Sequence, residues 1–318
     1  MTVLWVVEHD GSAPLETSLQ AAALARRYAG GAPLQAVAVG RAPAGLAEQG
    51  VEKLHLADHE IYGSFAPDAV ACAVGEALDR SGATAVVAAG TDSGNDVLAR
   101  VAARLDLPLA ANCVAATPGE PPHVVRVRWG GSLLEEALLR GSPALLTVQP
   151  HAVAVESVTG AEPEVEPFTP DLGEAETRVR VVERIGEAGG GISLADAKVV
   201  VSAGRGAGSP DGFAGVEELA ALLGGAVGCS RAVTMAGWRP HTDQVGQTGT
   251  KIAPDLYIAC GISGATQHMA GCKGAKRILA INTDPEAPIL ATADYAVIGD
   301  LHDVVPALSV AIRAERSA

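Results

Sequence analysis

The chain has 318 residues and a formal net charge of −14, from 37 acidic side chains against 23 lysines and arginines. This balance argues against a nucleic-acid-binding surface, which needs clustered positive charge to neutralise phosphates. Hydrophobic residues make up 48% of the chain but aromatic residues only 3%, so small aliphatic side chains must fill the cores. At about 100–200 residues per domain, the length predicts two domains.

The N-terminal segment and the cysteines predict a cytoplasmic protein without an integral membrane segment. No apolar run in the sequence approaches the roughly 18 residues that a membrane-spanning helix needs. Residues 1–11 lack a basic region and turn polar at Glu8, which favours a first strand over a signal peptide. Five cysteines without a C-x-x-C pair are not typical of a disulfide framework.

The first half of the chain alternates short apolar runs with amphipathic stretches, which is typical of a mostly parallel sheet covered on both faces. We predict strands at residues 3–7, 34–39, 53–56, 85–89, 109–116, 124–129 and 144–148. We predict helices at residues 15–28, 67–80, 96–105 and 133–139.

The composition changes between residue 159 and about residue 197. Residues 161–170 contain three prolines and three glutamates, and residues 189–191 are a glycine run. Between them, residues 177–184 alternate charged and apolar side chains, which predicts one strand. We interpret this region as the exit strand of the first domain and a linker at about 159–196. The predicted domains are therefore residues 1–190 and 191–318.

The second half begins again with a strand and predicts a second doubly wound α/β domain. Its predicted strands are residues 197–201, 226–228, 256–259, 277–281 and 295–298, and its predicted helices are residues 216–223, 265–271 and 304–316. The predicted fold class is thus α/β, with two doubly wound, mostly parallel sheets.

Polar and glycine-rich loops follow the strands of the second domain, where open parallel sheets bind their ligands. Glycines at 204, 206 and 208 and again at 261 and 264 let backbone N–H groups approach phosphate oxygens. Arg205 and Arg231 supply positive charge, and Asn282 and Asp300 can bind a ribose or a base. Together the loops predict a large ligand with phosphates, sugars and a ring.

Longer motifs in the same region carry a family resemblance. They are Gly204-Arg205-Gly206, Gly228-Cys229-Ser230-Arg231-Ala232, DQVGQTG at 243–249, PDLYIACGISGATQH at 254–268, INTDPEAPI at 281–289 and Ala293-Asp294-Tyr295. With these motifs, residues 197–317 resemble the FAD-binding domain of the alpha subunit of electron transfer flavoprotein. Residues 1–185 are more loosely similar to its N-terminal domain, at Glu8-His9, 96–105 and 145–150.

The resemblance implies FAD as the cofactor and neither a catalytic side chain nor a metal ligand. It implies that Arg231 lies over the flavin ring, Thr248 bonds to flavin N5, and His268 lies near the pyrimidine carbonyl. The pyrophosphate and ribityl chain would contact Arg205, Ser230, Ser263, Gly264 and Gln267, and the adenosine would contact Asn282 and Asp300. The other implied cofactor-binding residues are Gln244, Val245, Gly246, Gln247, Ala265, Thr266 and Leu301.

The resemblance also implies a role in electron transport. The chain would pair with a beta subunit through its first domain, with a hinge around residues 186–193. It would take electrons from flavin dehydrogenases, as in fatty acid oxidation, and pass them singly to a membrane quinone reductase or another acceptor. An anionic semiquinone would be stabilised by the guanidinium and imidazole near the ring. A bifurcating member, with a second flavin in the beta subunit, is an alternative.

An α/β hydrolase is the enzymatic alternative. Gly261-Ile262-Ser263-Gly264-Ala265 resembles a nucleophile elbow, and Asp284 and His302 follow in the order that such enzymes use. The fifth position is alanine and no oxyanion segment precedes the motif, so this hypothesis is weaker.

A metal site at His55, His59 and Glu60 is a second alternative. The spacing of the two histidines brings them together only on a helix, whereas residues 53–56 alternate like a strand. We therefore interpret the pair as solvated histidines at a strand end.

Overall fold

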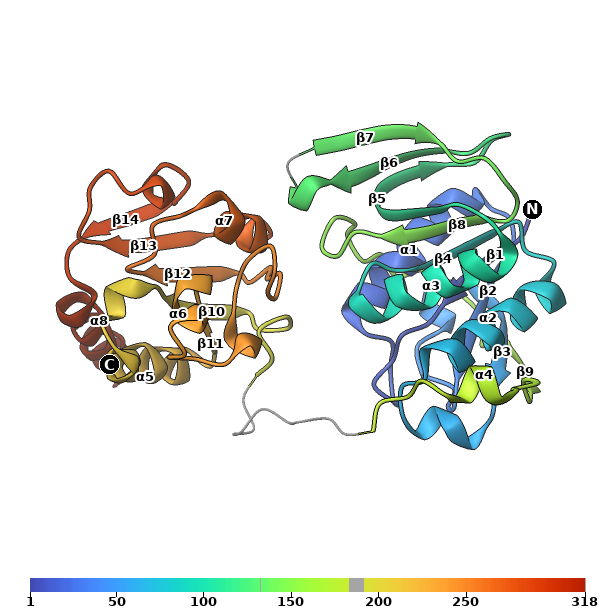
Figure 1. Cartoon of the computed structure of the whole chain (residues 1–318), viewed down its shortest axis with the longest axis horizontal. Coiled ribbons are helices and arrows are strands. Elements are labelled where there is room, and N and C mark those ends of the chain that lie inside the picture. Colours follow the sequence, from blue (N-terminus) through green and yellow to red (C-terminus); the bar gives the residue numbers. More distant parts are fainter. Residues whose placement is uncertain (132, 183–191, 318) are drawn as a thin grey trace. The chain divides into compact units, whose positions relative to one another are not determined.

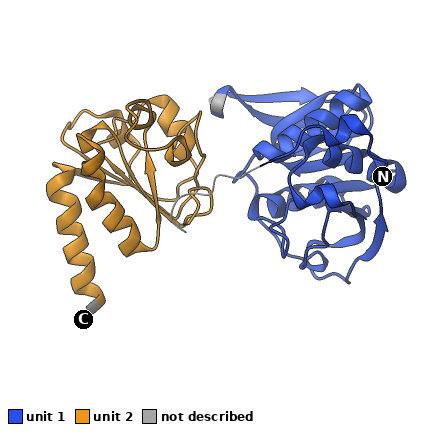
Figure 2. Ribbon diagram, turned by 60° about the horizontal axis from the view of Figure 1, so that its bottom comes forward, with its two compact units in different colours: residues 1–184 blue, residues 185–318 orange. Residues whose placement is uncertain are grey.

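The computed structural model describes residues 1–131, 133–182 and 192–317, and the chain divides into two compact units (Figures 1 and 2). The N-terminal unit comprises residues 1–184 and the C-terminal unit residues 185–318. Each unit has its own sheet, with a separate hydrophobic core on either face. The predicted α/β class with two mostly parallel sheets is thus confirmed.

The N-terminal unit contains a nine-stranded sheet in the order β7-β6-β5-β8-β4-β1-β2-β3-β9. In this order, all neighbouring strands from β5 through β8, β4, β1, β2 and β3 to β9 are parallel. The pairs β5-β6 and β6-β7 are antiparallel and extend the sheet at one edge. The strands are β1 (Val3–Val6), β2 (Leu34–Val39), β3 (Val51–Ala57), β4 (Ala85–Ala89), β5 (Leu109–Thr117), β6 (His123–Arg128), β7 (Leu133–Leu138), β8 (Ala144–Val148) and β9 (Glu164–Phe168).

Helices cover both faces of this sheet. Successive residues of β1 enter opposite cores, because Trp5 packs with α1 and Leu4 packs with α2 and α3. The strands in the middle of the sheet are therefore buried along their whole length, as their continuous apolar sequences predict. The helices are α1 (Glu16–Ala29), α2 (Pro67–Ser81), α3 (Asp92–Leu105) and α4 (Glu174–Thr177), with 3-10 turns at η1 (Ala47–Gln49), η2 (Glu60–Gly63) and η3 (Trp129–Gly131).

The predicted helix at residues 133–139 is wrong, because this segment forms β7. Its leucines have the spacing of a helical face, but Leu134 and Leu138 remain exposed, so a helix would gain no burial there. Pairing with β6 instead satisfies the backbone and sets Glu135 opposite Arg126, with 2.6 Å between the carboxylate and the guanidinium Nε.

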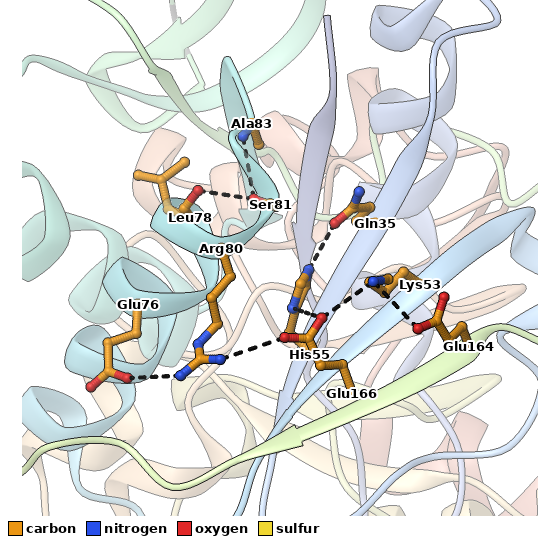
Figure 3. Close-up of polar contacts among 10 residues, drawn as sticks. All are labelled: Gln35, Lys53, His55, Glu76, Leu78, Arg80, Ser81, Ala83, Glu164 and Glu166. Atoms are coloured by element: carbon orange, nitrogen blue, oxygen red, sulfur yellow. Dashed lines mark hydrogen bonds and ion pairs between the residues drawn. The ribbon is translucent and has the colours of Figure 1, made fainter.

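Residues 161–170 were expected to be linker, but they contain β9, which is parallel to β3 at the edge of the sheet. Pro167 is compatible with an edge strand, because one side of that strand needs no hydrogen-bonded neighbour. Charge holds the strand in place: the Lys53 ammonium lies 3.4 Å from the Glu164 carboxylate and 3.3 Å from the Glu166 carboxylate (Figure 3).

The interpretation of His55 as a solvated histidine is also wrong, because its side chain is only 1% exposed beneath β9. Its Nε2 lies 2.7 Å from the Gln35 side-chain oxygen, and its Nδ1 lies 3.7 Å from Glu166 (Figure 3). Burial lowers the pKa of His55, although Glu166 opposes this shift. His55 is therefore a core residue that supports the edge strand.

The structure differs from the prediction at the end of this unit and at the start of α3. The predicted strand at residues 177–184 is wrong over its described part, because α4 ends at Thr177 and residues 178–182 are not in a strand. Residues 183–191, which include most of the predicted hinge, lie outside the described part of the chain. Earlier, α3 begins four residues before its predicted start, because the Thr91 hydroxyl caps it by accepting from Gly94 N–H at 2.9 Å.

The C-terminal unit has a fully parallel sheet in the order β11-β10-β12-β13-β14. Helices α5, α6 and α8 pack on one face, and α7 packs on the other. The strands are β10 (Val199–Ala203), β11 (Ala226–Cys229), β12 (Leu256–Cys260), β13 (Ile278–Asn282) and β14 (Tyr295–Ile298). The helices are α5 (Ala214–Leu223), α6 (Arg231–Met235), α7 (Thr266–Cys272) and α8 (Leu301–Ser317), with 3-10 turns at η4 (Arg205–Ala207), η5 (Pro210–Phe213), η6 (His241–Asp243) and η7 (Pro288–Ala291).

The strand order of the C-terminal unit changes direction at β10. The next strand in the chain, β11, lies on one side of β10, and the following one, β12, lies on the other. The chain therefore continues from β10 to α5 on one face and from β12 to α7 on the other, which leaves a crevice at the carboxyl edge, where open α/β sheets bind ligands. No helix in the described part of the chain is both long and apolar enough to cross a membrane.

Candidate cofactor site

A cavity of about 590 Å³ lies at the crevice that the strand order predicts. Its volume is within the range of roughly 300–1,000 Å³ that is usual for cofactor pockets. Loops after β10, β11, β12 and β13 contribute to its wall. The structure brings together most of the predicted residues in the lining: Arg205, Ser230, Arg231, Gln244, Val245, Gly246, Gln247, Thr248, Ser263, Ala265, Gln267, His268 and Asn282.

Four predicted residues do not line the cavity. Gly264 packs against the backbone of Ile289, Leu301 is buried in a core, and Thr266 begins α7. Asp300 accepts a hydrogen bond from His302 N–H at 2.9 Å at the start of α8. Gly204, Gly206 and Gly261, which were predicted as parts of the phosphate loops, also line the cavity. Lining residues without a predicted role are Ala232, Met235, Ile262, Thr283, Asp284 and Ala287. The position of Thr283 and Asp284 directly after β13 was a usable signal.

Close backbone contact between two glycine-rich loops forms the floor of the site. A Cβ atom on Gly204 would lie 2.3 Å from the Gly261 carbonyl oxygen, and one on Gly206 would lie 2.7 Å from the Gly261 Cα. Only glycine permits this approach. The N–H groups of Gly204, Gly206 and Gly261 donate to the backbone carbonyls of Cys260, Gly261 and Ile281, so the expectation that they bind phosphate oxygens is not met here. The floor carries no side chain of its own and lies beside Arg205, which leaves space and positive charge for the phosphate-bearing chain of a dinucleotide.

Two arginines make the cavity attractive to an anion. Arg205 and Arg231 are exposed and line the cavity. Neither guanidinium forms a hydrogen bond or an ion pair with a residue in the described part of the chain. By contrast, Arg239 in the same unit is paired with Asp243 at 2.7 Å and with Glu217. The cavity lining therefore holds two arginines without an ion pair in the described chain against one carboxylate, Asp284, which favours an anionic ligand such as a phosphate or a reduced flavin.

A short chain of hydrogen bonds orients the Thr248 hydroxyl. The Thr234 hydroxyl donates to the Gln244 side-chain oxygen at 2.7 Å, and the Gln244 amide donates to the Thr248 oxygen at 3.0 Å. Gln244 is only 2% exposed, so this arrangement is fixed by its surroundings. Because the Thr248 oxygen already accepts a hydrogen bond, its own proton remains available to an acceptor in the cavity, such as a ring nitrogen.

His268 lines the same cavity but is only 7% exposed. Its Nε2 lies 2.7 Å from the Tyr257 hydroxyl, and its Nδ1 has no hydrogen-bond partner in the part of the chain that is described. Burial lowers the pKa of His268 to about 4, although the Val245 backbone acts in the opposite direction. The imidazole of the chain without a bound ligand is therefore neutral at pH 7.

The lowered pKa of His268 predicts acid sensitivity of the C-terminal unit. Its stabilising contribution is complete above pH 6.5, the ordinary pKa, and is lost as the pH falls toward a folded-state pKa of about 4. That interval corresponds to about 3 kcal/mol of unfolding free energy. Urea unfolding at pH 7 and pH 4 measures it, and His268→Gln should lose less stability than the wild type over that range. An equal loss in both proteins would contradict this assignment.

The geometry does not favour the alternative chemistries. Ser263, Asp284 and His302 share no hydrogen bond in the structure, and the Asp284 carboxylate instead accepts from Glu286 N–H at 2.9 Å. The His59 Nδ1 accepts from Ile61 N–H at 3.1 Å. No group of three or more His, Cys, Asp or Glu side chains in the described ranges has the arrangement of a metal site.

Fold and cavity together define an α/β protein that binds a nucleotide cofactor at the carboxyl edge of its second sheet. Comparison with known families is consistent with this class. Residues 193–273 match the electron transfer flavoprotein FAD-binding domain, and residues 3–172 match the electron transfer flavoprotein domain. The second match covers more than half of the chain.

Individual relatives have similar lengths. The chain is 38% identical to an electron transfer flavoprotein subunit alpha of Mycobacterium tuberculosis over 320 residues, which cover 99% of each chain. It is 37% identical to that of Thermoanaerobacterium thermosaccharolyticum, over 81% of this chain and 80% of the relative. It is 34% identical to protein FixB of Clostridium saccharobutylicum, over 96% and 94%. The chain belongs to the electron transfer flavoprotein alpha-subunit family, and its cofactor is FAD.

Proposed function

We propose that this chain is the alpha subunit of a heterodimeric electron carrier and holds one FAD in residues 191–318. The observation that supports this proposal is the cavity. It combines close-packed glycine loops, two arginines without an ion pair and a buried imidazole at the point where the strand order changes direction. FAD supplies the redox chemistry when bound, accepting electrons and releasing them one at a time. The chain itself needs to bind, orient and shield the cofactor, and it needs no general base or nucleophile.

The residues around the cavity have distinct proposed roles. Arg231 places positive charge at the ring and favours reduction, and Thr248 donates a hydrogen bond to N5. Arg205 and the glycine loops bind the pyrophosphate with Ser230, Ser263, Gly264 and Gln267. Asn282 and Asp300 remain the proposed contacts of the adenosine. The Asn282 amide also donates to the Ile262 carbonyl at 3.0 Å, which fixes the loop after β12.

We further propose that residues 1–190 dock a beta subunit. Large apolar side chains are exposed along β7 and the turn before it, where Trp129 is 80%, Leu134 69% and Leu138 57% exposed. Subunit interfaces typically bury such apolar side chains against the partner chain. Flavin dehydrogenases are the proposed donors and a membrane quinone reductase the proposed acceptor, in the cytoplasm and in pathways such as fatty acid oxidation.

Purification with a co-expressed beta subunit tests this function. We expect a yellow one-to-one complex with a single FAD per pair, because the alpha chain offers one cavity of the required kind in its described part. Size-exclusion chromatography gives the stoichiometry of the chains, and absorbance of released flavin gives the cofactor count. Two flavins per pair would place the second one on the partner and indicate bifurcation. A colourless complex, or a chain that does not associate, would contradict the proposal.

A further inference from the structure

Behind the wall of the cavity, β12 and α7 bring a tyrosine and a histidine into contact. Tyr257 is completely buried, and its hydroxyl lies 2.7 Å from Nε2 of His268. Burial raises the pKa of the Tyr257 phenol well above its usual value, so the phenol keeps its proton. A buried O–H needs an acceptor, and Nε2 of His268 supplies one at hydrogen-bond distance.

The hydrogen bond from Tyr257 determines which nitrogen of His268 carries a proton. A neutral imidazole has one N–H donor and one acceptor nitrogen. If Nε2 accepts from Tyr257, the proton of the ring must be on Nδ1. This atom is buried and has no hydrogen-bond partner among the described residues. A protonated Nε2 would instead leave the phenol proton without this acceptor, which is costly inside a protein.

The charges around the pair also favour a neutral ring. The titratable groups that interact with Tyr257 are the thiols of Cys229, Cys260 and Cys272, and burial raises their pKa values to about 12, 12 and 11. They are uncharged at neutral pH and offer an imidazolium no counter-ion. Arg205 and Arg231 line the same cavity and disfavour a further positive charge, whereas the Asp284 carboxylate there is exposed.

We propose that Tyr257 is a positioning residue that fixes His268 as the neutral tautomer with its proton on Nδ1. The positive charge of the FAD site then comes from arginine alone, and the buried imidazole beside it is uncharged. The inference deepens the proposed function and depends on it for the identity of the ligand. The tautomer itself is a property of this chain and can be measured separately.

The ¹⁵N NMR spectrum of histidine tests the tautomer. The full-length chain in its complex with the beta subunit is labelled with ¹⁵N-histidine, and His268→Gln identifies the His268 signals by their loss. We expect one protonated nitrogen, Nδ1, and one unprotonated nitrogen, Nε2, with no change between pH 8 and pH 5.5. Tyr257→Phe should move a substantial part of the proton to Nε2, because the donor that kept this atom unprotonated is gone.

A matched control removes the hydroxyl of Tyr295, which is 61% exposed on β14 of the same unit. Tyr295→Phe should leave the His268 signals unchanged. Two protonated nitrogens at pH 7 in the wild type, or identical His268 signals in Tyr257→Phe and the wild type, would overturn the proposal. If Tyr257→Phe does not fold, the wild-type spectrum alone decides. A colourless sample would contradict FAD binding, while its ¹⁵N spectrum would still report the tautomer.

Discussion

Gly264→Ala is expected to destabilise the C-terminal unit by about 2–4 kcal/mol and to weaken FAD binding at least tenfold. Gly264 has a φ angle of +85°, which L side chains rarely adopt. A Cβ atom there would lie 2.4 Å from the backbone nitrogen and 2.6 Å from the Cα of Ile289. Because these are backbone atoms, the loop that carries Ser263 must move. Urea unfolding and fluorescence titration with FAD measure the two effects.

Gly208 provides a matched control. Its φ angle of +75° is also left-handed, but no atom lies within 4 Å of the position of a Cβ. Gly208→Ala therefore costs backbone strain alone, about 1 kcal/mol. If the two variants lost equal stability, the close packing of Gly264 on Ile289 would not be what holds the loop after β12.

Arg231→Ala is expected to lower the midpoint potential for the first electron of bound FAD by about 60–120 mV, or roughly 1.4–2.8 kcal/mol. Reduction adds negative charge to the flavin, and Arg231 is an exposed cation at the cavity that forms no ion pair in the described chain. Its removal makes that charge less favourable, so the potential shifts to more negative values. Spectroelectrochemical titration of the purified complex measures the potential directly.

Two other variants distinguish the effect of positive charge near the proposed flavin ring from that of positive charge elsewhere in the cavity. Arg231→Lys keeps the cation and should retain most of the potential, although it loses the planar guanidinium. Arg205→Ala removes the charge on the loop after β10, where the pyrophosphate is expected, so it should reduce affinity more than potential. Equal potentials in Arg231→Ala and the wild type would show that Arg231 is not close to the flavin ring.

The central strands were predictable from the sequence, whereas the edges of the N-terminal sheet were not. Strands such as β4 and β8 are buried on both faces, so their continuous apolar runs determine their structure. The edge strands β7 and β9 are largely exposed, and their sequences carry little of this signal. The leucines of residues 133–139 have a spacing that is typical of a helix, and Pro167 is a residue that is typical of a linker. Their structure depends on cross-strand partners that lie far away in the sequence.

The position of the candidate cofactor cavity was predictable for a similar reason. Parallel strands place all their carboxyl ends at one edge, so loops such as those at Gly204 and Gly261 must meet there. The state of His268 was not predictable, because its charge depends on burial and on the Tyr257 hydroxyl. Sequence motifs fix which side chains lie near a cofactor, whereas the pKa of each follows from packing.

A crystal structure of the yellow protein tests the central claim most directly. FAD should lie across the carboxyl edge of the C-terminal sheet, with its ring beside Arg231 and Thr248 and its pyrophosphate beside Arg205 and the glycine loops. Flavin bound at another place, or a different ligand in this cavity from a preparation supplied with FAD, would contradict the account.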